Sequence, residues 1–322
     1  MHRRAVLSGL ALTAVAPAVG QVLSASDRLP AEGLSDQTAG GCGPPQVAKG
    51  GIPLRRLDSG ADYVRYALGE LTIIALRDGY VDMPPTRLRQ MDNRPFGADL
   101  PTQIKLVDGK IRLSVNAFLV IDRDQYILID TGAANAWLPT MGGLLRALKE
   151  AGIARENIRT VALTHTHEDH VHGLVAADGS DAFPNLDRLF VPQREIGMFD
   201  AIERLARFRQ RRTPLVDGFN LSQNIRAVQA HGHEVGHTAF EASSADGKLL
   251  IWGDVVHVPS IQFARPELTW EFDTDQAEAR STRQRLLRMA AQANFCVAGA
   301  HLDFPGVGIV TKCDNGFSYM PL

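Results

Sequence analysis

The feature that most constrains this chain is the distribution of its histidines. The chain of 322 residues contains 10 histidines, and four of them fall between His165 and His172. A second group of three follows in the sequence: His231, His233 and His237. Isolated histidines usually belong to the core or the surface, whereas closely spaced histidines are typical of metal sites. If both histidine groups bind metal, the fold brings these two segments, which are far apart in the sequence, to one metal site.

The first histidine group directly follows an apolar run, Ile158–Leu163, which predicts a buried strand. Side chains at positions i and i+2 of extended backbone point to the same side, so His165 and His167 can converge on one ion. If the chain then turns, Asp169 and His170 can face a second ion nearby. The segment predicts a loop that holds most of a two-metal site; a polar loop without metal is the alternative.

Alternating apolar runs and helical patterns indicate the fold class. Two runs, 126–130 and 249–254, each look like a buried strand that ends in an aspartate, which hints at two related halves. The predicted strands cover 63–68, 71–76, 111–121, 126–129, 158–163, 225–229, 239–242, 249–252 and 295–298, and the predicted helices cover 139–151, 202–212 and 275–293. Strands and helices that alternate in each half favour an α/β protein with two packed sheets and helices outside.

Composition excludes several classes of protein. Hydrophobic residues make up 45% and charged residues 22%, as in soluble globular proteins, and the net charge of −2 argues against a nucleic-acid binder. The three cysteines include no C-x-x-C pair, which excludes a zinc ribbon and a thioredoxin-type site. One disulfide, Cys296–Cys313, is an alternative to unpaired thiols.

The N-terminus has the organisation of an export signal. A basic start is followed by the apolar run 5–16, and the small residues at 16–18 fit a cleavage site. Arg3 and Arg4 resemble a twin-arginine signal, so we expect a periplasmic or secreted protein exported by that route. An ordinary secretory signal is the alternative. No later stretch reaches ~18 uninterrupted apolar residues, so we expect no membrane anchor.

Five motifs occur in an order that resembles a known family. They are Asp130-Thr131-Gly132, H-x-H-x-D-H at 165–170, G-H-x-x-G-H at 232–237, Gly253-Asp254 and the histidine motif at 300–306. Together they resemble the metallo-β-lactamase superfamily, which implies a four-layer αββα sandwich. Residues 1–30 would then contain the signal peptide, 31–62 a Gly/Pro-rich linker or arm, and 63–322 the catalytic domain.

The resemblance also implies the metal ligands, residue by residue. The first ion would be bound by His165, His167 and His233, the second by Asp169, His170 and His301, and both by a bridging Asp254. Five imidazoles and two carboxylates without a thiolate suit zinc, and also manganese, iron or cobalt. We expect two Zn²⁺ because zinc needs no redox partner and is available outside the cytoplasm.

The sequence around the last motifs narrows the resemblance. Residues 253–259, 261–263 and 301–306 are similar to the branch that contains methyl parathion hydrolase, with relatives that act on lactones and aryl esters. This implies a metal-bridging hydroxide that attacks a small-molecule lactone, aryl ester or phosphotriester, with Asp169 or Asp254 accepting the proton. A β-lactamase, a glyoxalase-type thioesterase and a mononuclear iron persulfide dioxygenase are the alternatives. A homodimer is an alternative to a monomer.

Further side chains are expected beside the metals. His237, the second histidine of its motif, is expected to lie near the metals without binding them, as a catalytic residue that supports the ligands or contacts substrate; a purely structural role is the alternative. Phe304, Phe263 and His257 are expected to line an apolar substrate pocket, because each follows a ligand motif closely. His172, where relatives often carry glycine, either faces solvent or narrows the site.

Overall fold

The computed structural model describes residues 51–97 and 99–322, which belong to one compact unit. The predicted export signal and most of the predicted linker lie outside the described residues. Among the described residues, no helix is long and apolar enough to cross a membrane.

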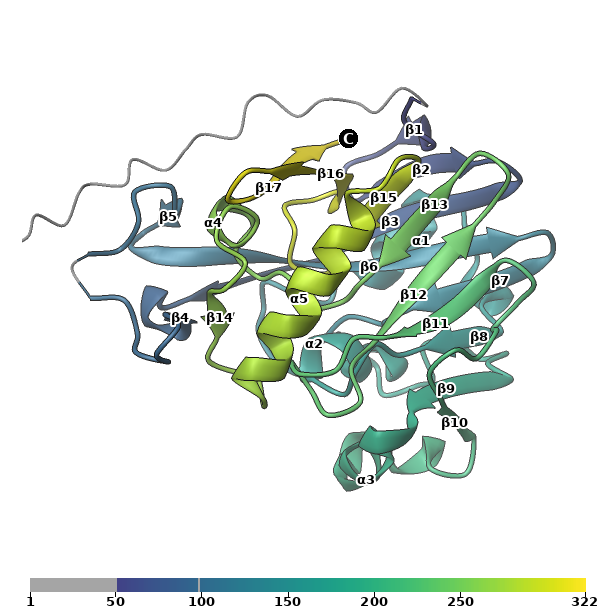
Figure 1. The fold of residues 1–322 in the computed structure, drawn as a ribbon. Coiled ribbons are helices and arrows are strands. Elements are labelled where there is room, and N and C mark those ends of the chain that lie inside the picture. The colour runs from purple at the N-terminus through teal and green to yellow at the C-terminus, as the bar shows by residue number, and fades with distance from the viewer. Residues whose placement is uncertain (1–50, 98) are drawn as a thin grey trace, which may run out of the picture. The chain divides into compact units, whose positions relative to one another are not determined.

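The first sheet has nine strands and is built from the N-terminal part of the described chain (Figure 1). Its strands are β1 (Arg55–Ser59), β2 (Tyr63–Leu68), β3 (Leu71–Met83), β5 (Leu106–Val107), β6 (Lys110–Asp122), β7 (Gln125–Ile129), β8 (Thr160–Ala162), β9 (Arg188–Pro192) and β10 (Arg212–Leu215). Their order is β1-β2-β3-β6-β7-β8-β9-β10, with β5 paired to β6. The strands pair antiparallel as far as β7, whereas β7 to β10 run parallel.

The second sheet has six strands from the C-terminal part of the chain. In spatial order they are β11 (Ile225–Gln229), β12 (Thr238–Ser243), β13 (Lys248–Ile251), β15 (Phe295–Ala298), β16 (Val307–Cys313) and β17 (Gly316–Pro321). Only β13 and β15 pair in parallel, and they are connected through the helix α5 (Gln276–Ala290). The short strands β4 (Leu88–Arg89) and β14 (Thr269–Trp270) form a separate pair. The other helices are α1 (Leu144–Glu150), α2 (Glu168–Val171), α3 (Ile196–Ala201) and α4 (Pro259–Gln262).

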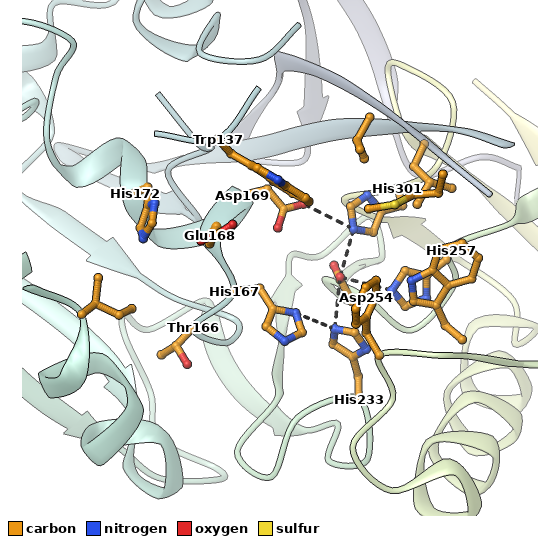
Figure 2. Close-up of a pocket in the computed structure, with 16 residues that line it drawn as sticks. Trp137, Thr166, His167, Glu168, Asp169, His172, His233, Asp254, His257 and His301 are labelled. Atoms are coloured by element: carbon orange, nitrogen blue, oxygen red, sulfur yellow. Dashed lines mark hydrogen bonds and ion pairs between the residues drawn. The ribbon is translucent and has the colours of Figure 1, made fainter. Parts of the chain in front are cut away.

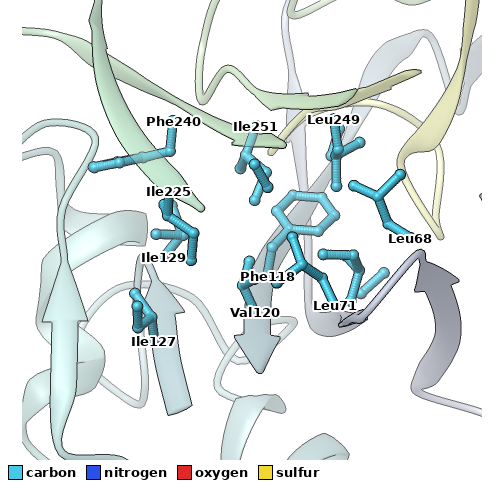
Figure 3. Packing of buried hydrophobic residues seen from close by; sticks show 14 of the residues in the cluster. Leu68, Leu71, Phe118, Val120, Ile127, Ile129, Ile225, Phe240, Leu249 and Ile251 are labelled. Carbon is cyan, nitrogen blue, oxygen red and sulfur yellow. The ribbon is translucent and has the colours of Figure 1, made fainter. Parts of the chain in front are cut away.

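The two sheets bury a common apolar core between them (Figure 3). Ile127 and Ile129 of β7 point into this core, whereas Leu128 points to the opposite face and packs in a second cluster with α1. In β13, Ile251 faces the core and Leu250 faces α5. This alternation follows from the two-residue period of a strand and makes both faces of each sheet apolar. The layers confirm the predicted α/β fold class, a four-layer αββα sandwich.

Several elements differ from the sequence prediction. In the described part of the segment predicted as a linker or arm, 51–62, the chain forms β1, which pairs with β2, and Leu54 is buried in the core. The predicted helix 139–151 begins only at Leu144, because the preceding backbone folds around Asp78: its carboxylate accepts the N–H groups of Gly142 and Leu144. The predicted helix 202–212 is instead a short 3₁₀ segment, Glu203–Phe208, followed by β10.

The C-terminal hairpin adds a correction, and the structure decides between the two alternatives for Cys296. Strands β16 and β17 were not expected, because glycines and a short polar turn interrupt their apolar pattern. Cys296 is a buried free thiol in β15, so the disulfide Cys296–Cys313 does not form.

Candidate metal centre

The predicted ligands lie on loops that follow the carboxyl ends of parallel strands. The parallel pair β7 and β8 precedes Asp130 and His165, and the parallel pair β13 and β15 precedes Asp254 and His301. Because the carboxyl ends of parallel strands meet at one edge of a sheet, these loops converge. His233 joins them from the loop between β11 and β12 (Figure 2).

The side chains form two groups that share one carboxylate. In one group, Nε2 of His233 lies 3.1 Å from Nδ1 of His167 and 3.3 Å from Oδ2 of Asp254. In the other group, Nε2 of His170 lies 3.2 Å from Oδ1 of Asp254, and Nε2 of His301 lies 2.9 Å from Oδ2. The potential ligand atoms are within 4.8 Å of one another in each of two sets: His165, His167, His233 and Asp254; and Asp169, His170 and His301. All seven predicted ligands are thus brought together, with Asp254 in contact with both groups.

Unpartnered buried atoms show that this cluster fits a divalent metal. Nε2 of His165, Nε2 of His170 and Oδ1 of Asp254 are buried and form no hydrogen bond of good geometry among the described residues, although the last two atoms lie 3.2 Å apart. Buried polar atoms normally have a hydrogen-bond partner. Three such atoms that face one point, two imidazole nitrogens and a carboxylate oxygen, indicate a binding site for a cation. Imidazole nitrogens and carboxylate oxygens without a thiolate are borderline ligands that suit zinc and its neighbours.

The electrostatics of the cluster favour a cation. Burial lowers the pKa of His165 well below its usual range, so this imidazole is neutral, as a ligand must be. Burial opposes ionisation of Asp254, but the neighbouring His301 and His170 outweigh it and hold its pKa well below the usual range. Burial also lowers the pKa of His233, whereas its bonds to Asp254 and Asp273 outweigh this effect and raise it to about 10. The carboxylates of Asp254 and Asp273 therefore give the cluster a negative potential that attracts a cation.

The nitrogen of each imidazole that points away from the cluster has its own partner. Such partners fix the ring orientation and leave the other nitrogen free to bind a metal. The contacts are His165 Nδ1 with Thr164 Oγ1 (3.0 Å), His167 Nε2 with Glu234 Oε1 (2.8 Å), His170 Nδ1 with Asp130 Oδ2 (2.8 Å), His233 Nδ1 with Asp273 Oδ1 (2.9 Å) and His301 Nδ1 with the Ser114 carbonyl (2.7 Å).

The cluster opens into a cavity of about 510 Å³. Its apolar lining consists of Val81, Met83, Leu113, Trp137, Ile202, Trp270 and Phe272 (Figure 2). His257 also lines it, stacked between Trp270 (ring centroids 5.2 Å apart) and His301 (5.1 Å). His172 is buried and lines the cavity, so of the two alternatives for this residue the structure supports the one that narrows the site.

The structure does not place three of the predicted residues on the cavity. His237 is buried behind the cluster, where Nδ1 donates to the Ala230 carbonyl (2.9 Å) and Nε2 accepts the Asp254 N–H (3.1 Å). Both nitrogens are therefore occupied, which corrects the expected contact with substrate and leaves His237 as a support for the Asp254 backbone. Phe263 stacks on Tyr319 inside the second-sheet core, and Phe304 lies under the Arg77 guanidinium. Closeness to a ligand in sequence did not predict the direction of these rings.

Several residues at the site were not predicted from the sequence. Glu234 is the third residue of its motif, and its position next to the ligand His233 was the one signal in the sequence. Glu195 and Asp273 follow no motif, and only the tertiary fold brings them to the ligand loops.

Comparisons with known proteins agree with this geometry. A family model described as the metallo-beta-lactamase superfamily matches residues 111–301. Among solved structures, hydrolase AbOPH in the beta-lactamase superfamily is 28% identical, with a TM-score of 0.72, and the match covers 82% of this chain and 99% of that one. AidC, described as a dizinc quorum-quenching lactonase in complex with a product, is 26% identical, with a TM-score of 0.70 and coverage of 81% and 97%. A probable metal-dependent hydrolase from Staphylococcus aureus shares the fold at 18% identity, with a TM-score of 0.66 and coverage of 79% and 98%. The search of curated proteins found no match.

The fold, the cluster and these similarities define a metal-dependent hydrolase. The chain belongs to the metallo-β-lactamase superfamily, whose family model matches more than half of it. The family and the enzyme class expected from the motifs are confirmed.

Glu195 connects the two main ligand loops and should make the stability of the folded chain depend on pH. This buried carboxyl accepts hydrogen bonds from Thr166 Oγ1 (2.8 Å) and the Gly236 N–H (3.1 Å), which joins the two main ligand loops. Burial raises its pKa from 4.5 to about 7. Between these values the unfolded chain loses the proton and the folded chain keeps it, so Glu195 lowers stability as pH rises through this window.

We expect Glu195→Gln to remove this dependence. The free energy of unfolding of the variant, minus that of the wild type, should rise by up to ~3 kcal/mol between pH 4.5 and 7.5, and then stay constant. Guanidinium unfolding of the metal-free proteins measures it. Glu203→Gln, at a 90% exposed side chain, is the control and should show no such trend. A difference that does not change with pH would contradict the raised pKa.

Proposed function

We propose that the protein is a dinuclear zinc hydrolase of neutral, apolar lactones or aryl esters. The observation that carries the proposal is a two-group ligand cluster, joined by Asp254, that opens into a mostly apolar cavity. The similarity to AidC supports it, because that relative is described as a dizinc lactonase with bound product.

The residues that would hold the two ions are those predicted from the sequence. His165, His167 and His233 would bind one ion, Asp169, His170 and His301 the other, and Asp254 both. Ions held in this way supply a water nucleophile that ionises near neutral pH, and they stabilise negative charge on the attacked oxygen.

The protein side chains then bind the substrate and move the proton. Asp169 and Asp254 both line the cavity and can accept a proton at a carboxylate oxygen. Burial lowers the pKa of His257 to about 4, so its imidazole is neutral near pH 7, and its Nε2 lies 3.3 Å from Oδ2 of Asp254. His257, whose ring stacks on Trp270, would therefore hold the shared carboxylate in place beside the substrate.

The cavity favours a neutral substrate with an apolar group. Among the described residues, its lining includes Glu168, Asp169 and Asp254 but no lysine or arginine, so neither of these cations is positioned to pair with an anionic group of the substrate away from the ligand cluster. The apolar side chains opposite the cluster offer contact area to an acyl or aryl group. Phosphotriesters are the second candidate, because hydrolysis at phosphorus also places negative charge on an oxygen beside the cluster.

The first experiment is a substrate panel. The zinc-reconstituted protein is assayed against lactones, aryl esters, phosphotriesters and a chromogenic cephalosporin. Turnover of lactones or aryl esters above the other classes supports the proposal, and preferred cephalosporin turnover would refute it.

A second experiment tests the shared carboxylate. Asp254→Ala should lower bound zinc and reduce kcat/KM by more than ~100-fold together, because one side chain serves both groups. Metal analysis and steady-state kinetics measure the two effects, and Asp246→Ala on an exposed loop is the control. Two tightly bound ions with near-normal turnover in the Asp254 variant would disprove the assignment.

A third experiment tests the apolar lining of the cavity. Trp137→Ala should raise KM for long-chain or bulky aryl esters by about tenfold, with little change in kcat, because it removes ground-state contact area. Short esters should be affected less. Phe304→Ala is the control, since that ring does not line the cavity. Equal effects of Trp137→Ala on short and long substrates would remove the support for an apolar acyl site.

We also propose export through the twin-arginine route to the periplasm or the medium, on the sequence evidence alone. Protein recovered from its native cells should lack the residues before about position 18, as mass spectrometry of the N-terminus would show. An intact Met1 would refute the proposal.

A further inference from the structure

Asp273 is a buried carboxylate that contacts the candidate metal centre from outside it. Its Oδ1 lies 2.9 Å from Nδ1 of His233, and its Oδ2 accepts the backbone N–H of Trp270 at 2.9 Å. The residue lies on the loop that leads into α5, and it belongs to none of the motifs described above.

The charge that balances Asp273 comes from Arg283, in the middle of α5. Its side chain is only 1% exposed, and a guanidinium N–H lies 3.4 Å from Oδ2 of Asp273. The same guanidinium donates to the carbonyls of Val255 (2.6 Å), Pro266 (3.2 Å) and Leu268. A buried charge persists only when it is paired and hydrogen-bonded, and here both conditions hold for the cation and the anion.

This pairing determines which nitrogen of His233 can act as a ligand. Oδ1 of Asp273 lies 2.9 Å from Nδ1 of His233 and accepts the Nδ1–H, while the guanidinium of Arg283, 3.4 Å from Oδ2, balances the carboxylate charge. Nε2 of His233 is then the nitrogen that faces the cluster, 3.1 Å from Nδ1 of His167 and 3.3 Å from Oδ2 of Asp254, and a bound cation would take the place of its proton.

A second carboxylate has the same relation to the other ligand group. Oδ2 of Asp130 lies 2.8 Å from Nδ1 of His170, and its two oxygens also accept the N–H and the hydroxyl of Thr164. His170 and His233 belong to different groups of potential ligands. The two carboxylates therefore contact ligands of different groups directly, and Asp130 reaches His165 of the other group only indirectly, through the Thr164 hydroxyl.

We propose that Asp273, held in place by Arg283, is a positioning residue for the ion of the His165, His167 and His233 group, and not for the other ion. The inference rests on the proposed dinuclear centre. It assigns to α5 a role in metal affinity in addition to its packing on the second sheet.

The test compares zinc binding by Asp273→Asn, Asp130→Asn and the double variant. Zn²⁺ is titrated into metal-free protein in competition with a chromophoric chelator, and metal content is measured after dialysis. Asp273→Asn should keep one tightly bound ion and bind the other about 10–100-fold more weakly. Asp130→Asn should weaken mainly the other ion, whose ligand His170 it contacts directly, and the double variant should lose tight binding of both ions.

Two further variants separate positioning from folding. Asp275→Asn changes a carboxylate on the same loop that caps α5 through the Ala277 and Glu278 N–H groups and contacts no ligand. Asparagine also caps helices well, so this control should bind both ions as the wild type does. Because Asp273→Asn leaves Arg283 without an anion, Asp273→Asn/Arg283→Met removes both charges and should fold, yet still bind one ion weakly. Denaturant unfolding of the metal-free proteins checks that they fold.

Several results would overturn the inference. The first is wild-type affinity for both ions in Asp273→Asn and in Asp273→Asn/Arg283→Met. The second is equal weakening of both ions in Asp273→Asn. The third is one ion that remains tightly bound in the Asp130→Asn/Asp273→Asn variant. A wild type that binds fewer than two zinc ions tightly would instead refute the dinuclear centre itself. The failures of the two proposals are thus distinguishable.

Discussion

The site depends on one buried carboxylate, Asp254, which faces imidazoles from both ligand groups. Its position is fixed by the backbone around it: Gly253 has a φ of +55°, and a Cβ there would lie 2.6 Å from Nε2 of His237. That nitrogen accepts the Asp254 N–H, so glycine and histidine together aim the carboxylate at the cluster. Any side chain at 253 would displace His237 and with it the residue that both groups share.

The convergence of the ligands follows from a β-α-β arrangement that occurs twice. In the first sheet, α1 connects the parallel strands β7 and β8; in the second, α5 connects β13 and β15. Each first strand is followed by an aspartate, Asp130 or Asp254, at the same edge. The two aspartates differ in use, because Asp130 holds His170 from behind whereas Asp254 lies among the imidazoles.

The parts of the site that could be predicted are those that a local sequence pattern determines. The strand before His165 and the i, i+2 spacing of the histidines describe local geometry, so the ligand loop could be predicted, and the ordered motifs implied the sandwich. The cavity wall could not be predicted in this way, because Val81, Leu113 and Trp137 reach it from three segments of the first sheet and its loops. The same holds for Asp273 and Arg283, whose contacts with His233 and Val255 exist only in the folded chain.

The burial of so many ionisable groups ties metal binding to folding. His165 and His170 repel each other when charged, and unpartnered atoms of both lie beside an unpartnered oxygen of Asp254. Without a cation these desolvated groups are unfavourable, and the apolar cores between and outside the sheets must offset them. A cation that binds the folded chain removes that penalty and adds its own binding free energy to stability. The carboxylates behind the cluster serve the same end, since they orient the imidazoles before an ion arrives and so reduce the ordering that binding requires.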